Sequence, residues 1–318
     1  MKLEQFMKKQ RLISLLILLA LLLSMGSVCV LAEDDTQEDV SDGPFEVDAK
    51  AAILIDMNTG RTVYEKNIDE RIYPASLTKI MTCLLALENG NLSDIVTIDE
   101  GAFAGLDGNS STAGLQVGEQ LTFNDLLYCL MISSGNEAAN AVAEHIAGSI
   151  PDFVRMMNER AYELGCTGTH FANPHGLTSG ENYATALDLA RLAQAALRNE
   201  LFREVVSTKT ITCAGRTLTN HNKLLWRYDG CIGVKTGYTK HAGRILVSAA
   251  ERNGQQLIAV TIADPDDWRD HAALLDHGFA VLALQSPVYP QIRRVVWKNG
   301  CKKSLHAAPA SPDAAQKP

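Results

Sequence analysis

Residues 245–261 read Ile-Leu-Val-Ser-Ala-Ala-Glu-Arg-Asn-Gly-Gln-Gln-Leu-Ile-Ala-Val-Thr, and this stretch decides the class of fold. Two runs of β-forming apolar residues flank an Asn-Gly dipeptide at 253–254, which favours the tight turn of a β-hairpin. A similar pair of runs lies near the other end of the chain, where 51–56 and 61–65 flank Asn-Thr-Gly at 58–60. The sequence therefore predicts one hairpin near each end of the folded region.

The segment between the two hairpins has the periodicity of helices. Thr122 and Asp125 form a capping box, which marks the start of a helix. Apolar residues recur at helical spacing in five stretches before the second hairpin and in one after it: 76–88, 126–131, 136–147, 151–164, 185–199 and 267–284. Strands at both ends with helices between them predict an α+β fold, in which one antiparallel sheet is formed from both chain ends and covered by helices.

The two ends of the chain differ from its centre. Basic residues precede the apolar run 12–23, and Val-Leu-Ala at 30–32 offers a cleavage site. These features predict that 1–32 is a secretory signal peptide, with an uncleaved transmembrane anchor as the alternative. We expect an exported protein, held outside the cytoplasmic membrane or secreted, with 33–48 a flexible acidic leader and 307–318 a disordered Ala/Pro-rich tail.

Composition excludes several classes of function. The chain of 318 residues has a formal net charge of −8 and no basic patch, so we expect no binding to nucleic acid. Its cysteines and histidines lack the spacing of metal ligands, and the sequence predicts no metal and no cofactor. We expect the core cysteines to be reduced thiols. Cys213 and Cys231 are the most plausible exception, as a pair that could form a disulfide.

Three short motifs carry the chemistry: Ser-Leu-Thr-Lys at 76–79, Ser-Gly-Asn at 134–136 and Lys-Thr-Gly at 235–237. Each is common by itself. In this order they describe an active site built around a nucleophilic serine and two lysines.

Ser76 and Lys79 are the expected nucleophile and general base. They lie three residues apart at a helix start and therefore on one face, where their side chains can meet. A serine hydroxyl is a weak nucleophile until a base takes its proton, and a lysine must be neutral to do so. Lowering a lysine pKa from about 10.4 to neutrality costs roughly 4 kcal/mol, which burial and a second cation, Lys235, can supply.

The other two motifs supply a proton relay and binding groups. Ser134 is expected to pass protons between the lysines and the leaving group, and Asn136 to orient Lys79 and bind a substrate carbonyl. Residues 231–234 read as an edge strand to which an extended peptide could add. Gly237 leaves room for that peptide, and the backbone N–H groups of Ser76 and Tyr238 are the predicted oxyanion hole.

The motifs lie in longer segments that resemble the penicillin-recognising serine enzymes, and among them the D-alanyl-D-alanine carboxypeptidases of the penicillin-binding protein 5 type. The segments are 56–67, 74–82, 173–177 and 233–239, within a resemblance that spans roughly 45–284. The resemblance implies a β-lactamase/transpeptidase-like domain over 49–285. It also implies release of the terminal D-alanine from peptidoglycan stem pentapeptides through a Ser76 acyl-enzyme, with β-lactam antibiotics as covalent inhibitors.

By the same resemblance, Thr236 and Arg269 would hold the terminal carboxylate of the substrate. Arg244, on the following strand, is expected to be an exposed charge. His175, in Asn-Pro-His-Gly-Leu at 173–177, is expected to be structural, because the lysines already provide the base.

The sequence departs from the family after 285. Residues 286–306 resemble only the opening strands of the small β-rich domain that usually follows, and no amphipathic helix is seen, so association with the membrane is left open. The alternatives within the same chemistry are a D,D-endopeptidase or a β-lactamase. A non-catalytic module that binds peptidoglycan or β-lactams is the alternative of another class.

Overall fold

The computed structural model describes residues 45–108 and 110–285. The predictions for the signal peptide, most of the leader, the β-rich remnant and the tail concern residues outside these ranges. Within them, no helix has both the length and the apolar character needed to cross a membrane.

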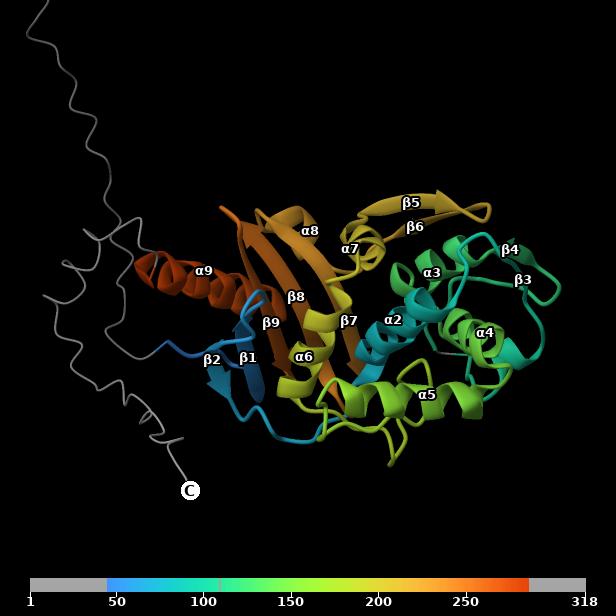
Figure 1. The fold of residues 1–318 in the computed structure, drawn as a ribbon, viewed down its shortest axis with the longest axis horizontal. Helices are drawn as coiled ribbons and strands as arrows, with labels where there is room; N and C mark the ends of the chain where they lie inside the picture. The colour runs from blue at the N-terminus through green and yellow to red at the C-terminus, as the bar shows by residue number, and fades with distance from the viewer. Residues whose placement is uncertain (1–44, 109, 286–318) are drawn as a thin grey trace, which may run out of the picture. The chain divides into compact units, whose positions relative to one another are not determined.

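Five strands form one antiparallel sheet with the order β2-β1-β9-β8-β7. They are β1 (Ala51–Asp56), β2 (Thr62–Lys66), β7 (Cys231–Thr239), β8 (Gly243–Arg252) and β9 (Gln255–Ile262). β1 pairs with β9, so the blue strands from the start of the domain lie beside the orange strands from its end (Figure 1). The predicted sheet of both chain ends is confirmed.

Most of the helices lie in the sequence between the two hairpins, and one helix follows the second hairpin. They are η1 (Ala75–Thr78), α2 (Lys79–Asn89), η2 (Gly101–Phe103), α3 (Phe123–Met131), α4 (Asn136–Ala147), α5 (Ile150–Glu163), α6 (Ala186–Ala196), α7 (Glu200–Ser207), α8 (Leu224–Arg227) and α9 (Asp267–Gln285). The predicted cap is confirmed, since the Thr122 side chain accepts from the Asp125 N–H at 3.0 Å.

Three local details differ from the prediction. The expected helix 76–88 begins as the 3₁₀ turn η1 and becomes α2 only at Lys79. The expected helix 185–199 ends at Ala196, and α7 is a separate helix because the Asn199 side chain caps it by accepting from the Phe202 N–H. Two small hairpins were not predicted: β3 (Ile95–Thr97) with β4 (Gln120–Thr122), and β5 (Thr210–Cys213) with β6 (Arg216–Thr219).

The two faces of the sheet are covered by different helices. On one face His271 of α9 contacts Ser248 and Thr261 through hydrogen bonds of 2.5 and 3.0 Å. On the other face Val247 and Val260 belong to the large core formed with α2, α3 and α6. Because cross-strand partners share a face, Lys235, which is opposite Val247, points toward the helices rather than toward α9.

The five cysteines of the described ranges are free thiols, and four of them are buried. Cys213 and Cys231, the pair considered for a disulfide, do not form one. The expectation of reduced core cysteines agrees with the structure.

Candidate active site

The structure brings the three sequence motifs together around one cleft of about 530 Å³. Ser76 comes from η1, Ser134 from the turn between α3 and α4, and Thr236, Gly237 and Tyr238 from β7. Ser76 and Tyr238, 162 residues apart in the sequence, therefore line one cleft, where η1 meets the edge strand of the sheet.

Lys79 lies beneath Ser76, at the first position of α2. Its Nζ is 3.1 Å from Ser76 Oγ, 2.7 Å from Asn136 Oδ1 and 2.7 Å from the His175 carbonyl oxygen. An amide oxygen and a carbonyl can only accept, whereas the serine hydroxyl can also donate. A neutral amine fits this set of partners, because it donates to the two fixed acceptors and keeps its lone pair for the Ser76 proton.

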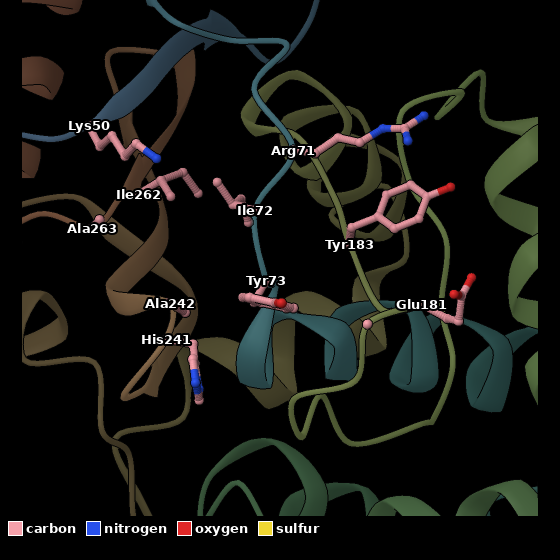
Figure 2. A pocket seen from close by; sticks show the side chains of 11 residues that line it. Lys50, Arg71, Ile72, Tyr73, Glu181, Tyr183, His241, Ala242, Ile262 and Ala263 are labelled. Carbon is pink, nitrogen blue, oxygen red and sulfur yellow. The ribbon is translucent and has the colours of Figure 1, made fainter.

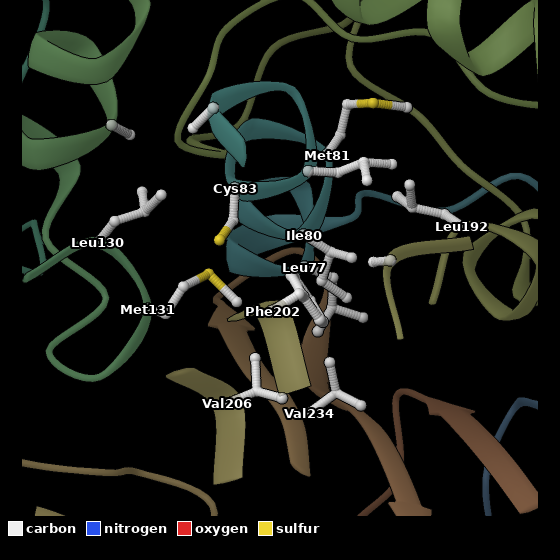
Figure 3. Packing of buried hydrophobic residues seen from close by; sticks show 14 of the residues in the cluster. Leu77, Ile80, Met81, Cys83, Leu130, Met131, Leu192, Phe202, Val206 and Val234 are labelled. Atoms are coloured by element: carbon white, nitrogen blue, oxygen red, sulfur yellow. The ribbon is translucent and has the colours of Figure 1, made fainter. Parts of the chain in front are cut away.

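The surroundings of Lys79 favour that neutral form. The Lys79 side chain is fully buried. The apolar residues of α2 belong to a core cluster with residues of α3, α6, α7 and β7 (Figure 3). Burial is the main cause that holds the pKa of Lys79 well below its usual range, and the charge of Lys235 acts in the same direction. Glu137 opposes both, but more weakly.

Lys235 is the second buried amine of the site. Its Nζ donates to the Thr236 carbonyl at 3.1 Å, and burial lowers its pKa to about 7. Ser134 has a left-handed backbone, with φ of 59°, and its buried Oγ has no hydrogen-bond partner within the described residues. The structure thus places Ser134 in the cleft without a closed hydrogen-bond chain between the two lysines.

The backbone of Tyr238 faces the free edge of the sheet. Arg244, its partner on β8, accepts at its carbonyl from the Asp264 N–H at 3.0 Å, so the polar backbone groups of Arg244 face β9. In an antiparallel ladder those of Tyr238 then face away from β8, into the cleft. Ser76 lies in the first turn of η1, where N–H groups have no partner within the helix. Neither of the two predicted oxyanion donors therefore has a hydrogen-bond partner within its helix or sheet.

β7 is an edge strand, as predicted, and its two halves have different neighbours. A Cβ on Gly233 would lie 2.7 Å from the Val206 side chain, so α7 packs closely against the face of β7 at this position. A Cβ on Gly237 would lie 2.8 Å from Ile245 and 3.3 Å from the Ser76 nitrogen. Thr236, Gly237 and Tyr238 line the cleft together with Ser76, so a peptide could add to β7 there.

The loop 173–177 positions Lys79, a function that the sequence did not reveal. Thr82 of α2 holds it by donating to the Pro174 carbonyl at 2.6 Å, and the His175 carbonyl then meets Lys79. Gly176 has φ of 93°, and a Cβ there would lie 1.7 Å from the Ala75 carbonyl oxygen, so only glycine fits. Burial lowers the pKa of His175 to about 3, which agrees with a neutral, structural side chain.

Arg269 is not at the cleft, which corrects the expectation drawn from the resemblance. Its side chain is 61% exposed and forms ion pairs with Asp48, Asp266 and Asp270. The arginine that lines the cleft is Arg244, which was expected to be a plain exposed charge. Strand alternation is the signal that identifies Arg244, because it lies opposite Tyr238 and on the same face as Thr236.

Arg244 is held by the start of α9. Its guanidinium pairs with Asp267 and lies 5.7 Å from the centre of the Trp268 ring, and both of these residues also line the cleft. The arginine thus has a defined place beside Thr236, while its side chain stays 44% exposed to the cleft.

Glu137 fixes the loop on the opposite wall of the cleft. Its buried carboxylate accepts from the Thr112 hydroxyl and the Ala113 N–H, both at 2.6 Å, and from the Gly114 N–H at 3.0 Å. Ser111 of that loop lines the cleft. No cluster of three or more metal-ligating side chains occurs in the described ranges.

The family model for D-alanyl-D-alanine carboxypeptidases, Peptidase_S11, matches residues 36–266. The D-alanyl-D-alanine carboxypeptidase DacF of Bacillus subtilis is 37% identical over 281 residues, which cover 83% of this chain and 71% of that protein. DacA of Haemophilus influenzae, a D-alanyl-D-alanine carboxypeptidase, is 37% identical over 239 residues, 72% of this chain and 61% of that protein.

Solved structures agree with these relatives. The Streptomyces K15 DD-transpeptidase has a TM-score of 0.70 at 35% identity and covers 75% of this chain and 99% of its own. Penicillin-binding protein 5 of Haemophilus influenzae has a TM-score of 0.71 at 35% identity, over 75% of this chain and 72% of its own. The transpeptidase-like α+β fold is confirmed, and the chain belongs to the D-alanyl-D-alanine carboxypeptidase family of serine peptidases.

Proposed function

We propose that the protein removes the terminal D-alanine from peptidoglycan stem pentapeptides through an acyl-enzyme on Ser76. The observation that carries this proposal is the position of Lys79 Nζ, 3.1 Å from Ser76 Oγ and bonded to two groups that only accept. Burial of that amine supports its role as the base.

The proposed reaction has two steps. Lys79 takes the Ser76 proton while Oγ attacks the carbonyl of the penultimate D-alanine, and the N–H groups of Ser76 and Tyr238 stabilise the oxyanion. The peptide C–N bond then breaks, and its nitrogen receives a proton through Ser134 and Lys235 as D-alanine leaves. Water attacks the resulting ester, so its hydroxyl goes to the acyl group and its proton returns to Ser76.

Asn136 has two proposed tasks. Its Oδ1 already accepts from Lys79, which leaves the amide N–H groups to bind a carbonyl of the substrate. Gly237 lets β7 approach Ser76 closely, since a Cβ there would lie 3.3 Å from the Ser76 nitrogen.

A test of the function uses fluorescent penicillin together with a pentapeptide that ends in D-Ala-D-Ala. We expect a stable adduct with penicillin, absent in Ser76→Ala, and release of free alanine from the peptide. Rapid turnover of penicillin would instead identify a β-lactamase, and cleavage of cross-linked muropeptides alone would identify a D,D-endopeptidase. A protein that forms no adduct and releases no alanine would be a non-catalytic module and would contradict the proposal.

We propose that Arg244, together with Thr236, binds the terminal carboxylate of the substrate. Arg244→Leu is expected to lower kcat/KM for the pentapeptide by about 10- to 100-fold, the value of a charge-assisted hydrogen bond. Arg269→Leu is the matched control, since it removes the same charge outside the cleft and should leave kcat/KM unchanged. The reverse ranking of the two variants would restore Arg269 as the carboxylate ligand.

We also propose that the protein acts outside the cytoplasm. The signal-peptide pattern in 1–32 supports export. The proposed substrate, peptidoglycan, lies in the same place.

A further inference from the structure

A second cavity, of about 610 Å³, lies next to the catalytic cleft, where the sheet meets the loops that lead into η1 and α6. Lys50, Ile262 and Ala263 line it from the sheet, and Arg71 and Tyr183 line it from the loops (Figure 2). No part of the proposed mechanism uses this cavity.

The cavity and the cleft share two chain segments. Tyr73 lines the cavity and Ser76, three residues later, lines the cleft. On the other side, Tyr238 lines the cleft and His241 the cavity. The rings of Tyr73 and His241 are 6.0 Å apart, so the two segments stay together at the border between the two sites.

The direction in which the substrate would lie along β7 leads toward this cavity. With the scissile carbonyl at the Tyr238 N–H and the terminal carboxylate at Thr236 and Arg244, the peptide runs antiparallel to β7. Its upstream residues then pass Thr239 and leave the cleft at His241. His241 lies in the turn 240–242 that follows β7, so a peptide that continues along β7 past Thr239 reaches this turn.

Arg71 gives the cavity a fixed cation. Its guanidinium lies 4.4 Å from the centre of the Tyr183 ring, and no carboxylate of the described ranges pairs with it. Lys50 is a second cation of the cavity, but it lies on the opposite side of the 71–73 segment from the Arg71 guanidinium and pairs with Glu70 (Figure 2). Glu181 is the one carboxylate among the described lining residues.

The wall that carries Arg71 is well braced. Ile72 and Ala184 exchange backbone hydrogen bonds of 2.9 Å, and Tyr183 and His170 form a similar pair at 2.8 and 2.9 Å. The Tyr183 ring also stacks on His170 at 5.8 Å. The cation is therefore presented on a rigid surface, which limits the entropy lost when a ligand binds.

We propose that this cavity binds the part of the stem peptide that precedes D-alanyl-D-alanine. Arg71 recognises the free carboxylate of its glutamyl residue, and Lys50 adds positive charge on the other side of the cavity. A glutamyl residue joined through its side chain leaves its α-carboxylate free, within the reach set by the antiparallel direction. The inference rests on the proposed function, because that function determines where the scissile carbonyl lies.

The test compares kcat/KM of the double variant Lys50→Ala/Arg71→Ala with that of the wild type on three substrates. These are a stem pentapeptide with a free glutamyl carboxylate, the same peptide with that group amidated, and a short acyl-D-Ala-D-Ala. We expect a loss of about tenfold on the first substrate alone. The matched control is Arg155→Ala/Arg198→Ala, which removes two positive charges at positions distant in the sequence from the residues of both sites. Its kcat/KM should equal that of the wild type on all three substrates.

Three outcomes would overturn the inference: no loss on the first substrate, an equal loss on the amidated peptide, or an equal loss on the short substrate. A binding measurement separates it from the proposed function. The upstream tripeptide, which lacks D-alanyl-D-alanine, should bind the wild type and bind the double variant at least fivefold more weakly, even if no alanine is released. A tripeptide that does not bind the wild type would also contradict the inference.

Discussion

Lys79→Arg is expected to lower the rate of Ser76 acylation by about 10⁴-fold, the upper range for loss of a general base. A guanidinium stays protonated at any pH at which the protein is folded, so it has no lone pair for the Ser76 proton. The variant keeps much of the length of the side chain, but it places a permanent positive charge where the wild type has a neutral amine. The loss would therefore report the missing base rather than a missing cation, and the rate of labelling by fluorescent penicillin measures it.

The control for this prediction is Lys66→Arg. Lys66 also donates to a backbone carbonyl, that of Val47 at 2.7 Å, but it lies on β2, away from the cleft. It should acylate at the wild-type rate. Circular dichroism of both variants checks that they are folded, and a folded Lys79→Arg protein that acylates normally would exclude Lys79 as the base.

The same base predicts how acylation depends on pH. Burial and Lys235 hold the pKa of Lys79 well below its usual range, so the amine is neutral at a pH where an exposed lysine is charged. Acylation of the wild type should fall as the pH is lowered through that pKa.

Lys235→Met is expected to make the protein more stable at pH 7 by about 4 kcal/mol, while it removes activity. The lysine pKa is about 7 in the folded protein, against about 10.4 in the unfolded chain, and the difference is a free-energy cost of burying this amine. A methionine of similar length needs no proton and fills the same buried space. Urea unfolding at pH 7 measures the gain.

The pH dependence of that stability gives an independent check. Between pH 7 and pH 10.4 the unfolded chain binds a proton that folded Lys235 lacks, so the free energy of unfolding rises with pH across this window. From pH 7 to 9.5 this residue should add about 3 kcal/mol in the wild type. Lys235→Met should lose that increment, and the exposed Lys209→Met should keep it. If the free energy of unfolding rose equally with pH in all three proteins, the pKa of Lys235 in the folded state would not be lowered, and the prediction would be wrong.

The fold was predictable where its signals are local. Turn residues between β-forming runs determined both hairpins, and helical spacing located most of the helices, because each depends on neighbours within a few residues. The break between α6 and α7 was missed because a single side-chain cap at Asn199 outweighs the continuing apolar period. The 3₁₀ start at η1 was missed as well, because apolar spacing does not distinguish a 3₁₀ turn from the first turn of an α-helix.

The candidate site, like the fold, was predictable only in part. By itself the sequence identified Ser76 and Lys79, whose spacing places them on one helical face, and it ordered them with Ser134, Asn136 and Lys235. The tertiary structure alone decided that the His175 carbonyl, 96 residues away, holds Lys79. It also decided that Arg244, and not Arg269, lines the cleft, and that α7 packs against β7 at Gly233. The reason is physical: spacing determines which side chains share a face, whereas packing between distant segments determines what that face meets.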